Sequence, residues 1–103
     1  MKVLWTETAV AHLIAIHEYI AKTSPVYAQL TVRRLWDRAG QLEQFPDSGR
    51  TVPESSHADL RELLEHPYRI LYEHLADRVR ILAIVHGRRG PGAIAEVESG
   101  RAT

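Results

Sequence analysis

The sequence predicts an α+β domain in which an N-terminal strand and an antiparallel helical hairpin pack on a small, mainly antiparallel β-sheet. Two observations carry this prediction: apolar residues recur every three or four positions over residues 7–44, and they follow a period of two over residues 60–86. The 103 residues, 45% of them apolar, suffice for one core and are too few for two domains. We therefore expect a single domain over residues 1–89 and a flexible C-terminal tail over residues 90–103.

The first helix has a clear start signal. Residues 2–5 form a short apolar run that is typical of a strand, and Thr6 closes it. Thr6 suits a helix N-cap, and Glu7 behind it suits the positively polarised first turn. The sequence therefore predicts a strand over residues 2–5 and a helix over residues 7–22.

The second helix begins almost at once. Ser24 followed by Pro25 is an N-cap with proline at the first helical position, and the apolar pattern then continues to about Gln44. The connection is so short that the two helices must form an antiparallel hairpin. Gly40 costs the second helix about 1 kcal/mol relative to Ala, and close helix packing is the expected reason for it.

Three strands follow a loop that is rich in Pro, Ser and Gly, over residues 60–66, 68–75 and 78–86. A two-residue loop at residues 76–77 fixes the pairing of the last two strands. The pairs expected on the core side are Tyr72 with Ile81, Ile70 with Ala83, and Tyr68 with Val85. The pairs expected on the opposite side are Glu73 with Arg80, Leu71 with Leu82, and Arg69 with Ile84, with His86 lying diagonally beyond Arg69.

The register of the strand over residues 60–66 stays open. The loop at His66 and Pro67 can hold two residues or three, and a slip of one residue turns Arg61 to the other face. We therefore expect an antiparallel meander but assign Arg61 to neither face.

Composition excludes several classes of function. Lys and Arg together number 13, as do Asp and Glu, so no global basic field attracts nucleic acid. There is no Cys, which excludes disulfides and thiolate chemistry and suits the cytoplasm. The N-terminus resembles neither a signal peptide nor a membrane span, so we expect no membrane association. His12 and His17 are not at the helical spacing of a metal pair, and we expect no metal and no cofactor.

Candidate functional residues gather around the end of the sheet. The strands and the preceding loop bring to one face Arg50, Glu54, Arg69, His86, Arg88 and Arg89. An Arg can hold a phosphate, while a Glu and a His can exchange protons with a ribose hydroxyl and a leaving oxygen, as a ribonuclease requires. The alternative is structural: Arg50 caps a loop, Glu54 pairs with a neighbouring Arg, and His86 ends a strand.

The chain resembles the RelE/ParE toxin superfamily over residues 2–89. The segments that carry the resemblance, in chain order, are Val3-Leu4-Trp5-Thr6, Phe45-Pro46-Asp47-Ser48-Gly49-Arg50, Val52-Pro53-Glu54, Arg61-Glu62, Tyr68-Arg69-Ile70-Leu71-Tyr72 and Ile81-Leu82-Ala83-Ile84-Val85-His86-Gly87-Arg88-Arg89. The resemblance implies a growth-arresting toxin of a type II, plasmid-stabilisation type toxin-antitoxin pair. A cognate antitoxin would neutralise it in a heteromeric complex.

Two activities occur in this superfamily. RelE-like and YoeB-like members cut messenger RNA on the ribosome, whereas ParE-like members poison DNA gyrase. The first implies that Glu54, Arg69 and His86 are catalytic, since they fall at or near the Glu, Arg and terminal His of the YoeB-type pattern. The second implies that Arg50, Arg61, Arg88 and Arg89 bind the target without proton transfer.

The sequence departs from the pattern of the nucleases and, less extensively, from that of the gyrase poisons. The final Tyr of the YoeB-type pattern and the multiple Lys of RelE proper are missing, and the net charge of zero is unusual for a protein that grips RNA. The Met-Asp common after the terminal His of ParE-type chains is replaced by Arg88-Arg89. We expect a ParE-like gyrase inhibitor, with a ribosome-dependent messenger RNA endonuclease as the alternative.

The two tryptophans and two surfaces of the predicted fold have expected roles in packing and in partner binding. Trp5 should close the core, whereas Trp36, with charged neighbours, either sits at the helix edge or marks a partner surface. A sheet edge and the outer groove of the helical hairpin are natural docking places for an antitoxin segment that folds on binding.

Overall fold

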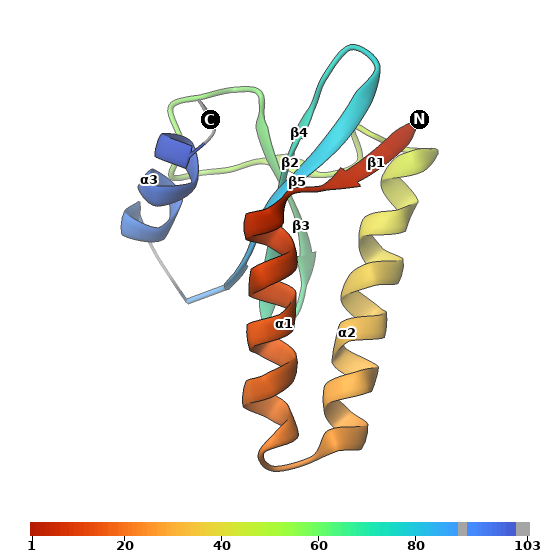
Figure 1. The fold of residues 1–103 in the computed structure, drawn as a ribbon. Helices are drawn as coiled ribbons and strands as arrows, with labels where there is room; N and C mark the ends of the chain where they lie inside the picture. Colours follow the sequence, from red (N-terminus) through yellow and green to blue (C-terminus); the bar gives the residue numbers. More distant parts are fainter. Residues whose placement is uncertain (89–90, 101–103) are drawn as a thin grey trace.

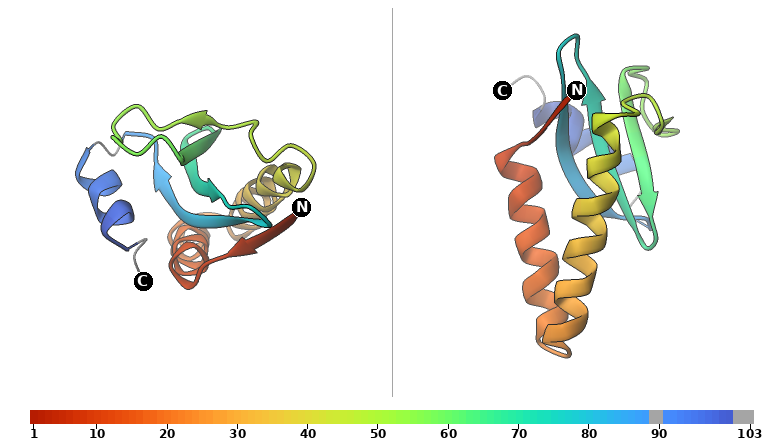
Figure 2. Two further views of the ribbon diagram at one scale, coloured as in Figure 1. Left: turned by 90° about the horizontal axis from the view of Figure 1, so that it is seen from above. Right: turned by 90° about the vertical axis from the view of Figure 1, so that its right-hand side faces the viewer.

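The computed structural model describes residues 1–88 and 91–100, and it has the predicted α+β architecture. The elements in chain order are β1 (Lys2–Trp5), α1 (Glu7–Ala21), α2 (Pro25–Gly40), the 3₁₀ turn η1 (Gln41–Glu43), β2 (Arg50–Thr51), β3 (Leu60–Glu65), β4 (Tyr68–His74), β5 (Arg78–His86) and α3 (Pro91–Gly100). The hairpin of α1 and α2 stands on one side of the sheet, and α3 lies beside β5 (Figures 1 and 2).

The sheet has the strand order β1-β5-β4-β3-β2. β1 runs parallel to β5, and every other neighbouring pair is antiparallel. The main core fills the space between the sheet and the helical hairpin, and it consists of Ala9, Leu13, Leu35, Ala39, Leu42, Leu63, Ile70, Tyr72, Val79, Ile81 and Ile84. Burying each large side chain of this set contributes about 1.5–3 kcal/mol, which holds the hairpin on the sheet.

The caps of the two long helices are those that the sequence predicts. Thr6 Oγ1 accepts a hydrogen bond of 3.2 Å from the Ala9 amide, and Ser24 Oγ accepts one of 3.1 Å from the Tyr27 amide. Each cap satisfies an amide that has no partner within its own helix. In the described ranges no helix is both long and apolar enough to cross a bilayer.

Gly40 ends α2, and η1 continues to Glu43, close to the predicted end at Gln44. The expected reason for Gly40 is wrong: a Cβ atom built there would meet no atom within 4 Å among the described residues. Its backbone angle φ is also negative, at −60°. Neither packing within the chain nor backbone conformation therefore requires a glycine at this position.

The pairing of β4 with β5 is as predicted only next to the hairpin loop. Tyr72 pairs with Ile81 and Glu73 with Arg80, and a β-bulge then places Leu82 as an extra residue in β5. The other four predicted pairs are wrong by one residue, and the observed pairs are Leu71 with Ala83, Ile70 with Ile84, Arg69 with Val85, and Tyr68 with His86. An extra residue in one strand shifts every later partner by one.

Side chains from the start of the chain support the bulge. Thr6 Oγ1 donates a hydrogen bond of 2.8 Å to the Ile81 carbonyl, and His12 Nδ1 accepts one of 3.2 Å from the Ile84 amide. A bulge interrupts the ladder of backbone hydrogen bonds, so these side chains serve backbone groups on both sides of it. The packing of α1 on β5 thus determines which residues after Leu82 face the hairpin.

The bulge creates a second core on the face of the sheet away from the hairpin. Ala83 and Val85, which were expected on the hairpin side, lie in this second core instead. Its members are Val52, Leu60, Leu71, Leu82, Ala83, Val85 and Ile94, with Val97 packed against them. Apolar residues of β5 therefore pack into cores on both faces of the sheet.

Helix α3 covers part of the second core, where the sequence predicts a flexible tail. Ile94 is 1% exposed, and Val97 packs beside it three residues later. His57 Nε2 lies 3.1 Å from Glu98 Oε2, which connects α3 to the loop before β3. One apolar residue per turn gives α3 an apolar stripe, and this stripe packs against the apolar face of the second core.

The open register of β3 is settled by a two-residue turn at His66 and Pro67. Glu65 pairs with Tyr68, and Arg61 pairs with Tyr72. Arg61 therefore shares the hairpin face of the sheet with Tyr72, because directly paired residues point to the same side.

Trp5 packs against the main core, as predicted. Its ring stacks on that of Trp36, with 5.1 Å between the centroids and 11° between the planes. Trp36 nevertheless remains 55% exposed.

Candidate functional site

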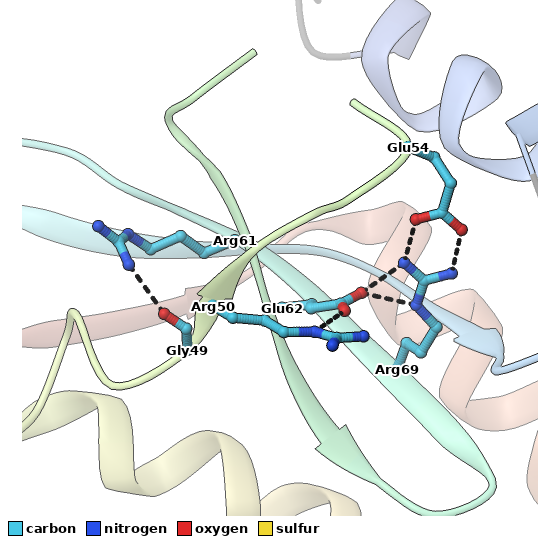
Figure 3. A network of polar contacts seen from close by, with 6 residues as sticks. All are labelled: Gly49, Arg50, Glu54, Arg61, Glu62 and Arg69. Carbon is cyan, nitrogen blue, oxygen red and sulfur yellow. Dashed lines mark hydrogen bonds and ion pairs between the residues drawn. The ribbon is translucent and has the colours of Figure 1, made fainter. Parts of the chain in front are cut away.

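Arg69 on β4 is the centre of the candidate site (Figure 3). Its Nη1 and Nη2 donate hydrogen bonds of 2.8 Å and 2.7 Å to the two carboxylate oxygens of Glu54. Its Nε donates a third, of 2.6 Å, to Glu62 Oε1. The Arg69 side chain is only 6% exposed, so these carboxylates take the place of water around the guanidinium.

Glu62 on β3 connects Arg69 to a second arginine. Its other oxygen, Oε2, accepts a hydrogen bond of 2.5 Å from Arg50 Nε on β2. The Glu62 side chain is fully buried, whereas that of Arg50 is 57% exposed. Two arginines and two glutamates thus form one network without net charge, which we call the Arg69 network.

Electrostatics stabilise the charged forms within the Arg69 network. The hydrogen bonds from Arg69 lower the pKa of Glu54 below its ordinary value, against the opposing effect of burial. The same hydrogen bonds raise the pKa of Arg69. Glu54 is therefore ionised at neutral pH and is a weaker base than a free glutamate.

Three members of the Arg69 network, Arg50, Glu54 and Arg69, line a groove of about 410 Å³ at the β3–β4 turn. The groove is lined by Arg50, Pro53, Glu54, Leu64, His66, Pro67, Tyr68, Arg69 and Gly87. Leu64, which is 48% exposed, offers an apolar contact there, while Glu54 offers a negative charge. The groove thus combines a carboxylate, arginine side chains and an apolar wall.

His86 lies apart from this groove. It pairs with Tyr68 and meets the Tyr68 ring edge-on, with 5.9 Å between the ring centroids, whereas Arg69 pairs with Val85. Successive residues of a strand point to opposite faces, so His86 and Arg69 lie on opposite faces of the sheet. The expectation that His86 lies diagonally beyond Arg69 on one face is wrong, because the bulge at Leu82 shifts the register.

The remaining predicted arginines are dispersed. Arg61 Nη1 donates a hydrogen bond of 2.8 Å to the Gly49 carbonyl, so Arg61 holds the turn before β2 (Figure 3). Arg88 is exposed beyond β5, and its backbone amide donates to His86 Nδ1 at 3.2 Å. Arg89 lies outside the described residues. The structure therefore brings Arg50, Glu54 and Arg69 together and separates them from His86.

Sequence reasoning missed Glu62. The pair Arg61-Glu62 carried part of the family resemblance, but Glu62 was given no role. The signal is visible in hindsight: Glu62 lies between Leu60 and Leu64 on one face of β3, and a carboxylate is almost never fully buried unless it is paired. A nearby arginine was to be expected.

The site offers no metal centre in the described part of the chain, since no group of three or more His, Asp or Glu could hold an ion there. What it offers is ion pairing and hydrogen bonding. For Arg69 to bind a phosphate, Glu54 or Glu62 would have to release the guanidinium, and breaking a buried pair costs about 3–5 kcal/mol.

The fold is similar to those of chains in two solved structures of toxin-antitoxin systems. A chain of the chromosomal ParDE toxin-antitoxin system from P. aeruginosa superimposes with a TM-score of 0.71 at 28% identity, covering 84% of this chain and 95% of that one. A chain of the toxin-antitoxin complex RelBE2 from Mycobacterium tuberculosis superimposes with a TM-score of 0.54 at 24% identity, covering 82% and 95%. The α+β fold is thus that of the RelE/ParE superfamily.

The sequence comparison defines the family within that class. The family model described as the ParE toxin of the type II toxin-antitoxin system parDE matches residues 3–91, and the chain belongs to this family of toxins. The toxin RelE2 of Caulobacter vibrioides is 38% identical over 89 residues, which cover 85% of this chain and 97% of that protein.

Proposed function

We propose that this toxin acts on DNA gyrase in the cytoplasm by binding, without cutting nucleic acid itself. The observation that carries the proposal is the state of Arg69: hydrogen bonds and ion pairs with Glu54 and Glu62 occupy its guanidinium. A target that is bound rather than cleaved requires no free Arg69 and no proton transfer. The match to the ParE family supports the same choice.

Cleavage of messenger RNA would make demands that this geometry does not meet. A ribonuclease places its phosphate ligand and its acid and base within hydrogen-bond reach of one phosphodiester. Here His86 lies on the face of the sheet opposite Arg69. Glu54 is held ionised by Arg69, which weakens it as a base.

The proposed contacts with the target come from Arg50, Arg61, Arg88 and Arg89. Arg50 retains 57% side-chain exposure although its Nε is bonded to Glu62, so its outer nitrogens are accessible to a partner. Arg88 is exposed beyond the end of β5. Arginine suits this role because its planar fork forms paired hydrogen bonds and stacks on partner groups.

The ribosome-dependent messenger RNA endonuclease is the second candidate function. One observation favours it: Glu54 and Arg69, two of the three residues of the nuclease interpretation, line the same groove. The relative from Caulobacter vibrioides also carries the name RelE2. Under this candidate, binding of the ribosome and the message would have to pull Glu54 away from Arg69.

A cognate antitoxin is the proposed partner that neutralises the toxin. The similar chain from P. aeruginosa belongs to a ParDE toxin-antitoxin system. Two surfaces suit an antitoxin segment that folds on binding: the outer edge of β1, which pairs only with β5 among the described strands, and the groove between α1 and α2. Strand addition would use the first surface, and an amphipathic helix would use the second.

The test incubates the purified toxin with each candidate target in turn. The first assay contains gyrase with relaxed and supercoiled plasmid, and the second contains translating ribosomes with a defined messenger RNA. We expect blocked supercoiling or accumulated cleaved plasmid, with the message intact. Message cut only in the presence of ribosomes, with gyrase unaffected, would replace the proposal with the endonuclease. Free toxin without antitoxin should arrest growth, and co-expressed antitoxin should relieve the arrest.

A further inference from the structure

The outer face of the helical hairpin carries apolar side chains that the fold does not cover. Val10 and Ile14 on α1 are 38% and 53% exposed, while Leu30 and Trp36 on α2 are 45% and 55% exposed. Between the helices lies a groove of about 840 Å³, lined by His17, Val26, Gln29, Leu30, Val32, Arg33, Trp36 and Asp37. Exposed apolar side chains that gather around a groove are typical of an interaction site.

The polar groups in this groove are self-complementary. Arg33 and Asp37 are both exposed, are four residues apart on α2, and form no ion pair within the described residues. A two-fold axis that runs perpendicular to α2 and passes beside its outer face at the level of residue 35 is equally far from both positions. It would therefore place Arg33 of each copy opposite Asp37 of the other.

The same axis would explain why residue 40 is a glycine, for which the single chain gives no reason. Gly40 and Leu30 lie five residues on either side of residue 35, so the axis brings Leu30 of one copy over Gly40 of the other. Apart from its chain neighbours and the adjoining backbone of α2, no described atom would lie within 4 Å of a Cβ at position 40, which leaves space for a partner side chain. The two Trp36 rings would meet beside the axis and bury their exposed area.

From these three relations we propose that the free toxin forms a symmetric dimer in which the α2 helices of two copies pack antiparallel. Two Arg33–Asp37 ion pairs lie on either side of the axis next to the Trp36 rings, and a contact of Leu30 with Gly40 lies beyond each pair. The occupant of this face in the free protein is thus a second copy of the chain. An antitoxin helix that uses the same groove must first separate the two copies. The proposal does not rest on gyrase or the ribosome being the target.

Charge exchange tests the dimer. Arg33→Asp makes both ion pairs repulsive, and Asp37→Arg does the same with the opposite sign, so each variant alone should dimerise on the order of tenfold or more weakly. Mixing the two variants restores attraction in both pairs, because positions 33 and 37 are both acidic in the first variant and both basic in the second. The mixture should therefore form a heterodimer, as measured by analytical ultracentrifugation of toxin purified without antitoxin.

Arg34→Asp is the matched control, because Arg34 is the next residue of α2, is exposed, and lines a different pocket near the β3–β4 turn. This variant should dimerise like the unmodified toxin, and circular dichroism checks that every variant is folded. An unmodified toxin that stays monomeric at micromolar concentration overturns the proposal. So does a dimer that both single variants leave intact, or a mixture of folded variants that fails to associate.

Discussion

Glu54 and Arg69 are joined by two parallel hydrogen bonds, of 2.8 Å from Nη1 to Oε2 and 2.7 Å from Nη2 to Oε1. A carboxylate in this geometry matches the guanidinium fork as a phosphate would. The Glu54 carboxylate thus occupies the position at Arg69 that a phosphate would need in a nuclease mechanism. This relationship joins the fold to the proposed function, since the pair holds the loop before β3 to β4.

Stability should depend on the ionisation of Glu54. Its pKa is lower in the folded protein than in the unfolded chain, so its contribution is fully present above the ordinary glutamate value of about 4.3 and is lost as pH falls through the folded value. The free energy of unfolding of the unmodified toxin should exceed that of Glu54→Gln most above pH of about 5. Denaturant titrations across this range measure the difference, and a gap that does not shrink in acid contradicts the prediction.

Removing the charge of Glu62 should destabilise the fold strongly. Glu62→Gln leaves Arg69 and Arg50 with one carboxylate between them, and loss of one partner from a buried pair costs about 3 kcal/mol or more. Glu65→Gln is the matched control on the same strand, because its contact with Arg38 is 3.8 Å long and partly exposed, and should cost about 0.5 kcal/mol or less. Equal losses in the two variants, measured by urea unfolding, would refute a structural role for the Arg69 network.

Gly49 should tolerate no side chain. A Cβ atom there would lie 2.5 Å from the Glu62 carbonyl oxygen and 2.6 Å from the Tyr72 hydroxyl, so β2 would have to move off the sheet. We expect Gly49→Ala to lower the free energy of unfolding by about 2 kcal/mol. Gly92→Ala, with no atom within 4 Å of its Cβ, should not destabilise the protein. A thermal melt of Gly49→Ala that matches that of Gly92→Ala would show that the turn adapts.

The hydroxyl of Tyr72 should contribute to stability in addition to its ring. It accepts a hydrogen bond of 2.9 Å from the Gly49 amide and donates one of 2.9 Å to the Pro46 carbonyl. Tyr72→Phe leaves a buried amide without that partner and should cost about 1–3 kcal/mol. Tyr19→Phe serves as the control at a site that is 74% exposed and should stay within about 0.5 kcal/mol of the unmodified protein. Chemical denaturation of both variants distinguishes these outcomes.

Local signals in the sequence were sufficient for α1, α2 and the end of the β4–β5 hairpin. Thr6 and Ser24 carry their capping role in their own chemistry, and a two-residue loop fixes the pair Glu73–Arg80. The bulge at Leu82 left no such signal. Residues 81–85 are all apolar, so no alternation of polar residues marks a change of face.

The candidate site was predictable only in part for the same reason. Glu54 and Arg69 were grouped correctly because loop and strand must meet at that end of the sheet. His86 was grouped with them wrongly, because its face depends on a bulge that Thr6, the N-cap of α1, and His12 within α1 support. Helix α3 was missed because Gly and Pro precede it and its apolar stripe is short. Contacts distant in the sequence decide both features.

The most direct test of the central claim compares the unmodified toxin with His86→Ala in a gyrase supercoiling assay and in a ribosome-dependent messenger RNA cleavage assay. His86 is exposed at the end of β5 and away from Arg69, so the variant should fold normally. We predict that both proteins inhibit gyrase with potencies within about threefold of each other and that neither cuts the message. Message cleavage by the unmodified toxin that falls on the order of a hundredfold in His86→Ala, with gyrase unaffected by either protein, would contradict the account.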